Sequence, residues 1–194
     1  MAIVVHYVLY KYNYHIITIN FKEEITMSNI DNKPNVTDNE KANIQRGAIG
    51  HRATWMALTY LAAKEAGHEE DGEKFARAGI SKTGLRDGQS FKCKCKAVPT
   101  DCGELADVFL SDTTRACFEI DFKTVTPERL DMEFHHCPLL KAWQDLGLDD
   151  ETCEKLCDMA MDGDRGIAKG MGLNFHLGDT IAQGKPTCQV SFFR

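Results

Sequence analysis

Positive charge is scarce in this chain of 194 residues. Lys and Arg number 23 against 29 Asp and Glu, which gives a net charge of −6 and a pI of about 5.6. No basic cluster and no zinc-finger spacing offsets this balance. Because nucleic acids and anionic membranes are bound through clustered Lys and Arg, we predict neither of them as a partner.

Motifs of several enzyme classes are also missing. The sequence contains no Gly-rich phosphate loop, nucleophile elbow or HExxH pair, so the sites that these motifs mark are not indicated. The N-terminal stretch MAIVVHYVLYKYNYHIITINF lacks the basic start, apolar centre and cleavage site of a signal peptide. Lys11, Asn13 and His15 interrupt the same stretch as a membrane span. We therefore expect a cytoplasmic protein.

Residues 1–39 are predicted to be an N-terminal extension. The polar residues 28–39, with one proline, are expected to be a flexible lead-in. We interpret Met27 as the native start, so that residues 1–26 come from a mis-called upstream reading frame. The alternative is that these residues form an edge strand or a disordered arm.

Residues 40–194 are predicted to form a single α+β domain. With 43% hydrophobic and 27% charged residues, the chain can bury a sizeable core. Helical spacing comes first and strand spacing follows, mixed with further helices. This order predicts N-terminal helices packed on a mainly antiparallel sheet, with a C-terminal half of strand, helix, helix and hairpin.

The first predicted helix, residues 40–66, places Ile44, Trp55 and Leu58 among its inward side chains. A weaker helix over 69–80 is followed by glycines that we expect to break the chain. The other predicted elements are strands over 91–103, 115–125 and 129–136, helices over 138–146 and from Asp149 or Asp150 onward, a glycine-rich turn over 163–172, and a closing hairpin over 173–193.

Cysteine is unusually frequent for a chain of this class. A chain of this length needs no disulfide staples, so we expect reduced thiols, and a disulfide scaffold is the weaker alternative. The eight cysteines are Cys93, Cys95, Cys102, Cys117, Cys137, Cys153, Cys157 and Cys188.

The stretch EFHHCPLLKAW, residues 133–143, contains the most suggestive cysteine. Pro138 is favoured at the first position of a helix, so Cys137 is a candidate N-cap whose thiol pKa the helix N-terminus would lower. His136 shares the apolar face of the preceding strand and is a candidate base or ligand, whereas His135 is expected in solvent. The alternative is that Cys137 and His136 are ordinary core residues.

A second set of candidates lies further along the chain. Cys157 is on the apolar face of a predicted helix, and Cys188 is on the last strand. With Cys137 they form a candidate Cys₃ metal site, closed by His136, Asp158 or water, although the spacing matches no standard zinc motif. Burial in the core explains the same cysteines without a metal.

Three segments resemble the L-2-amino-thiazoline-4-carboxylic acid hydrolase family: HCPLLKAWQDLGL, CEKLCDMAM and DTIAQGKPTCQVSF. The predicted helix that precedes them, HRATWMALTYLAAKEAGHE, also resembles the first helix of the family. Members carry a Cys-Pro at a helix start, a C-x-x-x-D-like motif one helix later, and a hairpin that closes on C-x-hydrophobic-x-F. Here these motifs fall on Cys137-Pro138, Cys153 or Cys157 with Asp158, Thr180-Ile181, Gly184, Cys188 and Phe192. The resemblance covers most of residues 40–194. The first hairpin strand, Asn174-Phe175-His176, is less basic than is usual in the family, which leaves the exact substrate open.

This resemblance implies a hydrolase that opens 2-amino-thiazoline-4-carboxylate, a cyclic C–N/C–S compound, to N-carbamoyl-cysteine. We assign Cys137 as the thiolate nucleophile or as the ligand of a water-activating divalent metal such as zinc. His136 and Asp158 would then transfer protons. The residues assigned to substrate binding are Arg165, as clamp for the carboxylate, Thr180 and Trp143.

The alternative function is a small-molecule-binding module of the 4-vinyl-reductase-like kind, in which the cysteines hold a structural metal. Both readings predict a small-molecule ligand, and both leave assembly into a homo-oligomer open.

Overall fold

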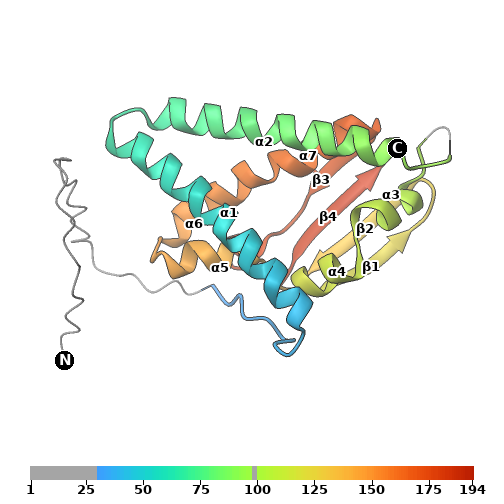
Figure 1. The fold of residues 1–194 in the computed structure, drawn as a ribbon, viewed down its shortest axis with the longest axis horizontal. Helices are drawn as coiled ribbons and strands as arrows, with labels where there is room; N and C mark the ends of the chain where they lie inside the picture. The colour runs from blue at the N-terminus through green and yellow to red at the C-terminus, as the bar shows by residue number, and fades with distance from the viewer. Residues whose placement is uncertain (1–29, 98–99) are drawn as a thin grey trace.

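A computed structural model describes residues 30–97 and 100–194 (Figure 1). The interpretation of residues 1–26 therefore lies outside the described residues. The elements in chain order are α1 Glu40–Glu65, α2 Glu69–Lys92, α3 Cys102–Phe109, α4 Asp112–Phe118, β1 Ile120–Val125, β2 Arg129–Phe134, α5 Pro138–Asp145, α6 Asp150–Ala160, α7 Asp162–Met171, β3 Asn174–Leu177, the 3₁₀ turn η1 Ile181–Gln183 and β4 Cys188–Phe193.

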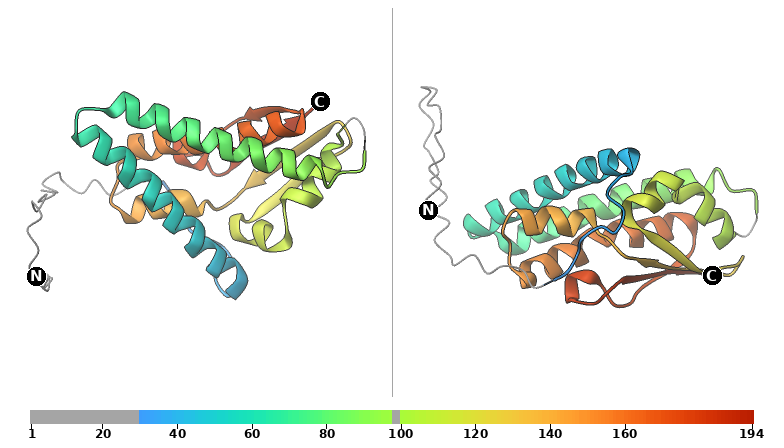
Figure 2. Two further views of the ribbon diagram at one scale, coloured as in Figure 1. Left: turned by 45° about the horizontal axis from the view of Figure 1, so that its top comes forward. Right: turned by 90° about the horizontal axis from the view of Figure 1, so that it is seen from below.

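The four strands form one antiparallel sheet in the order β1-β2-β4-β3. Seen edge-on, the sheet is one layer and the long helices lie on one side of it (Figure 2). This arrangement confirms the predicted α+β class. The predicted strand over 129–136, the two helices after it and the closing hairpin are confirmed as well, with boundaries that differ by a few residues.

Helix α1 begins as predicted but buries a different face. Asn39 caps it by accepting a hydrogen bond from the Ala42 N–H at 3.0 Å. Trp55 is 70% exposed, and the predicted inward residues Ile44 and Leu58 are exposed too. The buried stripe consists of Ala42, Ile49, Ala53, Ala57 and Tyr60. Helix α1 therefore carries two apolar stripes. The stripe with small side chains lets α5 approach closely, and this stripe faces the core.

The glycines of α2 do not break the helix, which runs without interruption to Lys92. The glycine-rich stretch after Asp162 is also helical, as α7, rather than a turn. A Cβ on Gly84 would lie 2.0 Å from the carbonyl oxygen of Gly163, and one on Gly166 would lie 2.5 Å from that of Ser81. The glycines therefore allow backbone-to-backbone packing of α2 on α7, which a prediction from local propensity misses.

Two predicted strands are wrong in part. The predicted strand over 91–103 is instead the end of α2, a connection and the start of α3, which Asp101 caps by accepting from the Gly103 and Glu104 N–H groups. The first half of the predicted strand over 115–125 is the end of α4. Glu119, at φ +53°, then turns the chain into β1. A left-handed glutamate is rare, and this corner is held by contacts from distant residues described below.

The apolar side chains gather in two clusters. One lies between the sheet, α3 and α7, and the other lies between α1, α5, α6 and η1. Cys137 and Cys188 pack at the edge of the second cluster. Within the described ranges, no helix combines the length and the apolar character needed to cross a bilayer.

We predict that Gly84→Ala lowers the free energy of unfolding by about 3 kcal/mol, because its methyl group would overlap the backbone of α7. Gly79→Ala is the matched control on the same helix, since nothing lies within 4 Å of its added Cβ. The control should gain about 1 kcal/mol from helix propensity. Urea unfolding followed by circular dichroism measures both values, and equal stability of the two variants would contradict the packing argument.

Candidate active site

Cys137 occupies the predicted N-cap position of α5, with Pro138 at the first helical position. Strand β2 delivers the chain to this point, where the His136 N–H donates to the Phe118 carbonyl at 3.1 Å. Burial raises the pKa of the Cys137 thiol, while the nearby Leu140 and Leu139 N–H groups lower it, and the net pKa is raised. The expectation of a lowered pKa is therefore wrong, because desolvation of the sulfur outweighs the helix N-terminus.

Two further thiols and a hydroxyl meet Cys137 at this point. Burial raises the pKa of Cys157, on α6, and the neighbouring Cys137 and Cys188 raise it further, whereas a hydrogen bond with Thr180 lowers it. Cys188 begins β4, and its sulfur accepts a hydrogen bond from the Ile181 N–H at 3.2 Å. Burial and then Cys137 raise the pKa of Cys188 to about 12. The structure thus brings together Cys137, Cys157, Cys188 and Thr180 from α5, α6, β4 and the start of η1, with protonated thiols at neutral pH.

The three thiols were predicted as a metal site. All eight cysteines are free. Among residues 30–97 and 100–194, no set of three or more His, Cys, Asp or Glu side chains is arranged so that it could hold a metal ion. The sulfurs are neighbours without the geometry of a ligand set, and zinc at Cys137, Cys157 and Cys188 stays a prediction.

Asp164 is the site residue that the sequence analysis missed. It lies in the first turn of α7 and is partly buried. Burial raises its pKa to about 6, and the charges of Arg165 and then Arg52 of α1 oppose this shift. The negative charge of Asp164 in turn makes a small contribution to the raised pKa of Cys137, so the carboxyl lies within electrostatic range of the thiol. The signal was present as acidic residues at a helix start, but the glycines around Asp164 suggested a turn.

His136 is buried, as predicted, with 2% of its surface exposed. Its Nδ1 lies 3.0 Å from the Asn32 carbonyl oxygen, which can only accept, so Nδ1 carries the proton. Burial and then Arg46 lower the pKa of His136, which keeps the ring neutral at pH 7. The groups that shift the pKa of Cys137 are the α5 N–H groups and Asp164. The structure thus gives His136 a structural partner, and its role in proton transfer stays a prediction.

Asp158 and Arg165 face each other instead of the thiols. Arg165 Nη2 lies 2.6 Å from Asp158 Oδ1, and Arg77 Nη2 lies 2.7 Å from Asp158 Oδ2. Arg165 also pairs with Asp162 at 2.7 Å. Although burial raises the pKa of Asp158, the arginines lower it more, so it is a weak base. Both predicted roles would require these ion pairs to open.

Trp143 is a core residue. Its side chain is 1% exposed, and its indole N–H donates to the Ala53 carbonyl at 3.0 Å. It therefore positions α5 against α1. A role in substrate binding, as assigned from the sequence, would act through that packing.

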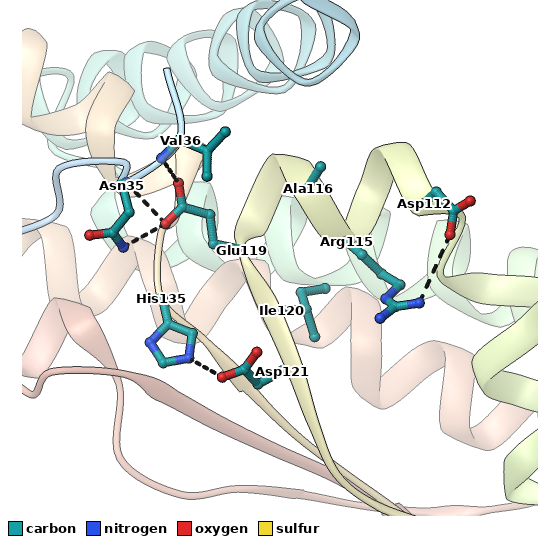
Figure 3. Close-up of a pocket in the computed structure, with 9 residues that line it drawn as sticks. All are labelled: Asn35, Val36, Asp112, Arg115, Ala116, Glu119, Ile120, Asp121 and His135. Carbon is teal, nitrogen blue, oxygen red and sulfur yellow. Dashed lines mark hydrogen bonds and ion pairs between the residues drawn. The ribbon is translucent and has the colours of Figure 1, made fainter. Parts of the chain in front are cut away.

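An open hollow of about 440 Å³ lies elsewhere, between the segment before α1, α4 and β1 (Figure 3). Its charged groups are paired with one another, for example His135 Nε2 with Asp121 Oδ2 at 3.0 Å. His135 is thus at the surface, as predicted. The lining of the hollow contains none of the predicted site residues, so we place the candidate active site at the thiols and Asp164. The lining residues are Asn35, Val36, Asp112, Arg115, Ala116, Glu119, Ile120, Asp121 and His135.

Comparison with known proteins gives one match. A family model described as L-2-amino-thiazoline-4-carboxylic acid hydrolase matches residues 46–192. A search of curated proteins and a search of solved structures found no match. The matched range contains the three thiols, Thr180 and Asp164.

We predict that Asp164→Asn makes the protein more stable at pH 8. The folded-state pKa of about 6 is above the usual value, so the ionised carboxylate costs folding free energy above pH 6. That cost is absent below pH 4, where the group is protonated in the folded state. Thermal unfolding should therefore show a higher Tm for the variant at pH 8 and equal Tm values at pH 4.

Asp162→Asn is the matched control in the same turn. Asp162 pairs with Arg77 and Arg165, so its loss should lower the Tm at pH 8. A Tm for Asp164→Asn below that of the native chain at pH 8 would contradict the placement of Asp164 in a desolvated site.

Proposed function

Because the chain belongs to the L-2-amino-thiazoline-4-carboxylic acid hydrolase family, we propose that it is a hydrolase that opens a cyclic amidine-like C–N/C–S ring to an N-carbamoyl-cysteine-type product. The observation that carries this proposal is the Cys137 thiol at the α5 N-terminus with the Asp164 carboxyl within electrostatic range of it. This pair offers a nucleophile and a base whose pKa lies below that of the thiol.

In the proposed first step, ionised Asp164 accepts the proton of Cys137 as the sulfur bonds to ring C2. The C2–S bond of the ring then breaks, and Asp164 returns the proton to the departing sulfur. The Leu139 and Leu140 N–H groups stabilise the sulfur of Cys137 while it carries negative charge. The product of this step is an isothiourea bonded to Cys137.

In the second step water attacks the same carbon, with Asp164 as base. The bond to Cys137 breaks, one water proton passes through Asp164 to the thiol, and the other goes to the former ring nitrogen. C2 then leaves as the carbonyl of a urea. The sum of the steps is the addition of one water, and the ring sulfur becomes the free thiol of the product.

The carboxylate of the substrate needs a cation. The charges of Arg165 and then Arg52 lower the pKa of Asp164, and of these two arginines Arg52 is the one that ion pairs leave available. Arg52 is exposed on α1, and its charge lowers the pKa of Asp164, so it lies on the Asp164 side of the site. In the described part of the chain it takes part in no hydrogen bond or ion pair, whereas Arg165 is held by Asp158 and Asp162. Arg52-Ala53 also belongs to the helix that resembles the first helix of the family.

We predict that Cys137→Ser lowers turnover of 2-amino-thiazoline-4-carboxylate by about a thousandfold or more, because a serine hydroxyl is a far weaker nucleophile beside this carboxyl. Release of the product thiol, measured with a chromogenic disulfide, gives the rate. Cys93→Ser is the control, because Cys93 is exposed on the connection after α2 and should not affect turnover.

Retained activity in Cys137→Ser would remove Cys137 from the mechanism. Metal content is measured on the same anaerobically purified samples. Loss of one bound zinc together with activity would instead assign Cys137 as a metal ligand.

We predict that Arg52→Ala raises the KM for 2-amino-thiazoline-4-carboxylate by about 100-fold and leaves the KM for 2-amino-thiazoline, which has no carboxylate, unchanged. Arg165→Ala is the comparison, and it should lower the Tm through loss of its ion pairs while keeping discrimination between the two compounds. The reverse pattern, with discrimination lost in Arg165→Ala alone, would return the clamp to Arg165.

A further inference from the structure

Asn32 joins the segment before α1 to the start of α5, 105 residues away. Its side-chain oxygen accepts from the Cys137 N–H at 2.8 Å, and its side-chain nitrogen donates to the Cys137 carbonyl at 2.9 Å. Its own backbone carbonyl accepts from His136 Nδ1 at 3.0 Å. One asparagine thus binds both backbone groups of Cys137 and the ring of the preceding residue.

The burial of Asn32 shows that this contact is specific. Asn32 is 4% exposed, whereas its neighbours Asp31 and Lys33 are exposed. A buried amide without partners would cost free energy, and here its oxygen and its nitrogen both have one. The segment has no helix or strand of its own, so side-chain contacts alone hold it.

Further contacts from outside the segment hold its described part, residues 30–39. Glu119 accepts from the Asn35 N–H, the Asn35 side chain and the Val36 N–H at 2.7–3.0 Å (Figure 3). Arg46 donates to the Val36 carbonyl at 2.7 Å and pairs with Glu119 at 3.0 Å. Gln144 of α5 donates to the Ile30 carbonyl at 2.9 Å. We expected a flexible lead-in, and these contacts instead give the segment a defined path.

The backbone of Cys137 needs an external partner for a physical reason. As the residue between β2 and α5, its N–H belongs to neither the strand ladder nor the helix. Pro138 fixes the next φ angle but has no N–H to offer. The Leu139 and Leu140 N–H groups lower the pKa of Cys137, so the orientation of the Cys137 backbone affects how closely its sulfur approaches them.

We infer that Asn32 is a positioning residue of the active site, which holds the backbone of Cys137 so that the sulfur faces the N–H groups of the first turn of α5. The catalytic consequence rests on the proposed function, and the geometric one does not. Asn32 lies before the family match, which begins at residue 46, so this chain completes the site with a segment outside the family pattern. His136 then acts as a clamp for that segment.

The test reads the ionisation of one thiol and needs no turnover. Alkylation of the full chain by iodoacetamide is followed at Cys137 by peptide mass spectrometry between pH 6 and 11, in the native chain and in Asn32→Ala. The titratable groups around this thiol, Asp164, Cys117, Cys157 and Cys188, are unchanged in both. We expect the midpoint for Cys137 to move up by about one pH unit, which is a tenfold smaller thiolate fraction at a given pH below it.

Asn35→Ala is the matched control, because it removes one contact of the same segment to Glu119 and none to Cys137. It should leave the midpoint where it is. An unchanged or lower midpoint in Asn32→Ala, or an equal shift in both variants, would overturn the inference, because the residue would then only fasten the segment. If Asn32→Ala does not fold, the uncharged Asn32→Leu, which is similar in size and binds neither backbone group of Cys137, is judged by the same criteria.

Kinetics separate this inference from the proposed function. With 2-amino-thiazoline-4-carboxylate, Asn32→Ala should lower kcat about 100-fold at unchanged KM, as expected for a misplaced nucleophile. A native chain without hydrolysis would overturn the proposed function, while the shift of the midpoint would still support the role of Asn32. A shifted midpoint with native kcat would show that Asn32 does not serve catalysis.

Discussion

The backbone contact between α2 and α7 is the constraint on which the rest of the structure depends. Gly84 and Gly88 on one helix and Gly166 and Gly170 on the other leave no room for a single methyl group. This contact sets the depth at which α7 lies and hence where its first turn points. Asp164 lies in that turn, directly after Gly163, whose carbonyl touches Gly84. The packing of two helices thereby places a carboxyl group within electrostatic range of Cys137.

Desolvation of the Asp164 carboxyl lowers the stability of the fold, and the same desolvation makes the carboxyl a stronger base. Its desolvation raises the pKa to about 6, close to the pH of a neutral solution. A base with a normal pKa would hold a proton too weakly to take it from a thiol whose own pKa is raised. Burial of Asp164 therefore lowers the stability of the fold and at the same time raises the proton affinity of this carboxyl. Shifted pKa values of this kind are common in active sites.

Features that depend on neighbouring residues could be predicted from the sequence, and features that depend on distant ones could not. Pro138 alone indicates that Cys137 is an N-cap, and the alternation of β2 alone places His136 inside. Glycines such as those of α2 can mark the end of a helix or a surface on which another helix packs closely. The local sequence looks the same in both cases, and only the position of α7 distinguishes them. The two apolar stripes of α1 present the same difficulty. Asn32 gives no local signal, because its partner is 105 residues away and its neighbours are polar.

The same contrast between local and distant contacts explains why the pKa of Cys137 is raised, although a lowered pKa was expected. A helix N-terminus lowers the pKa of a cysteine, and this local effect is present at Cys137 as the influence of two N–H groups. Burial by α6, η1 and β4 is a non-local effect of opposite sign, and it is the larger one. Cys137 therefore rests as a thiol, which is less prone to oxidation than a thiolate. Such a thiol reacts only when a base takes its proton, so a resting state of this kind requires a partner such as Asp164. It also makes the orientation of the sulfur decisive, because the N–H groups can stabilise the thiolate only in the short time during which it exists.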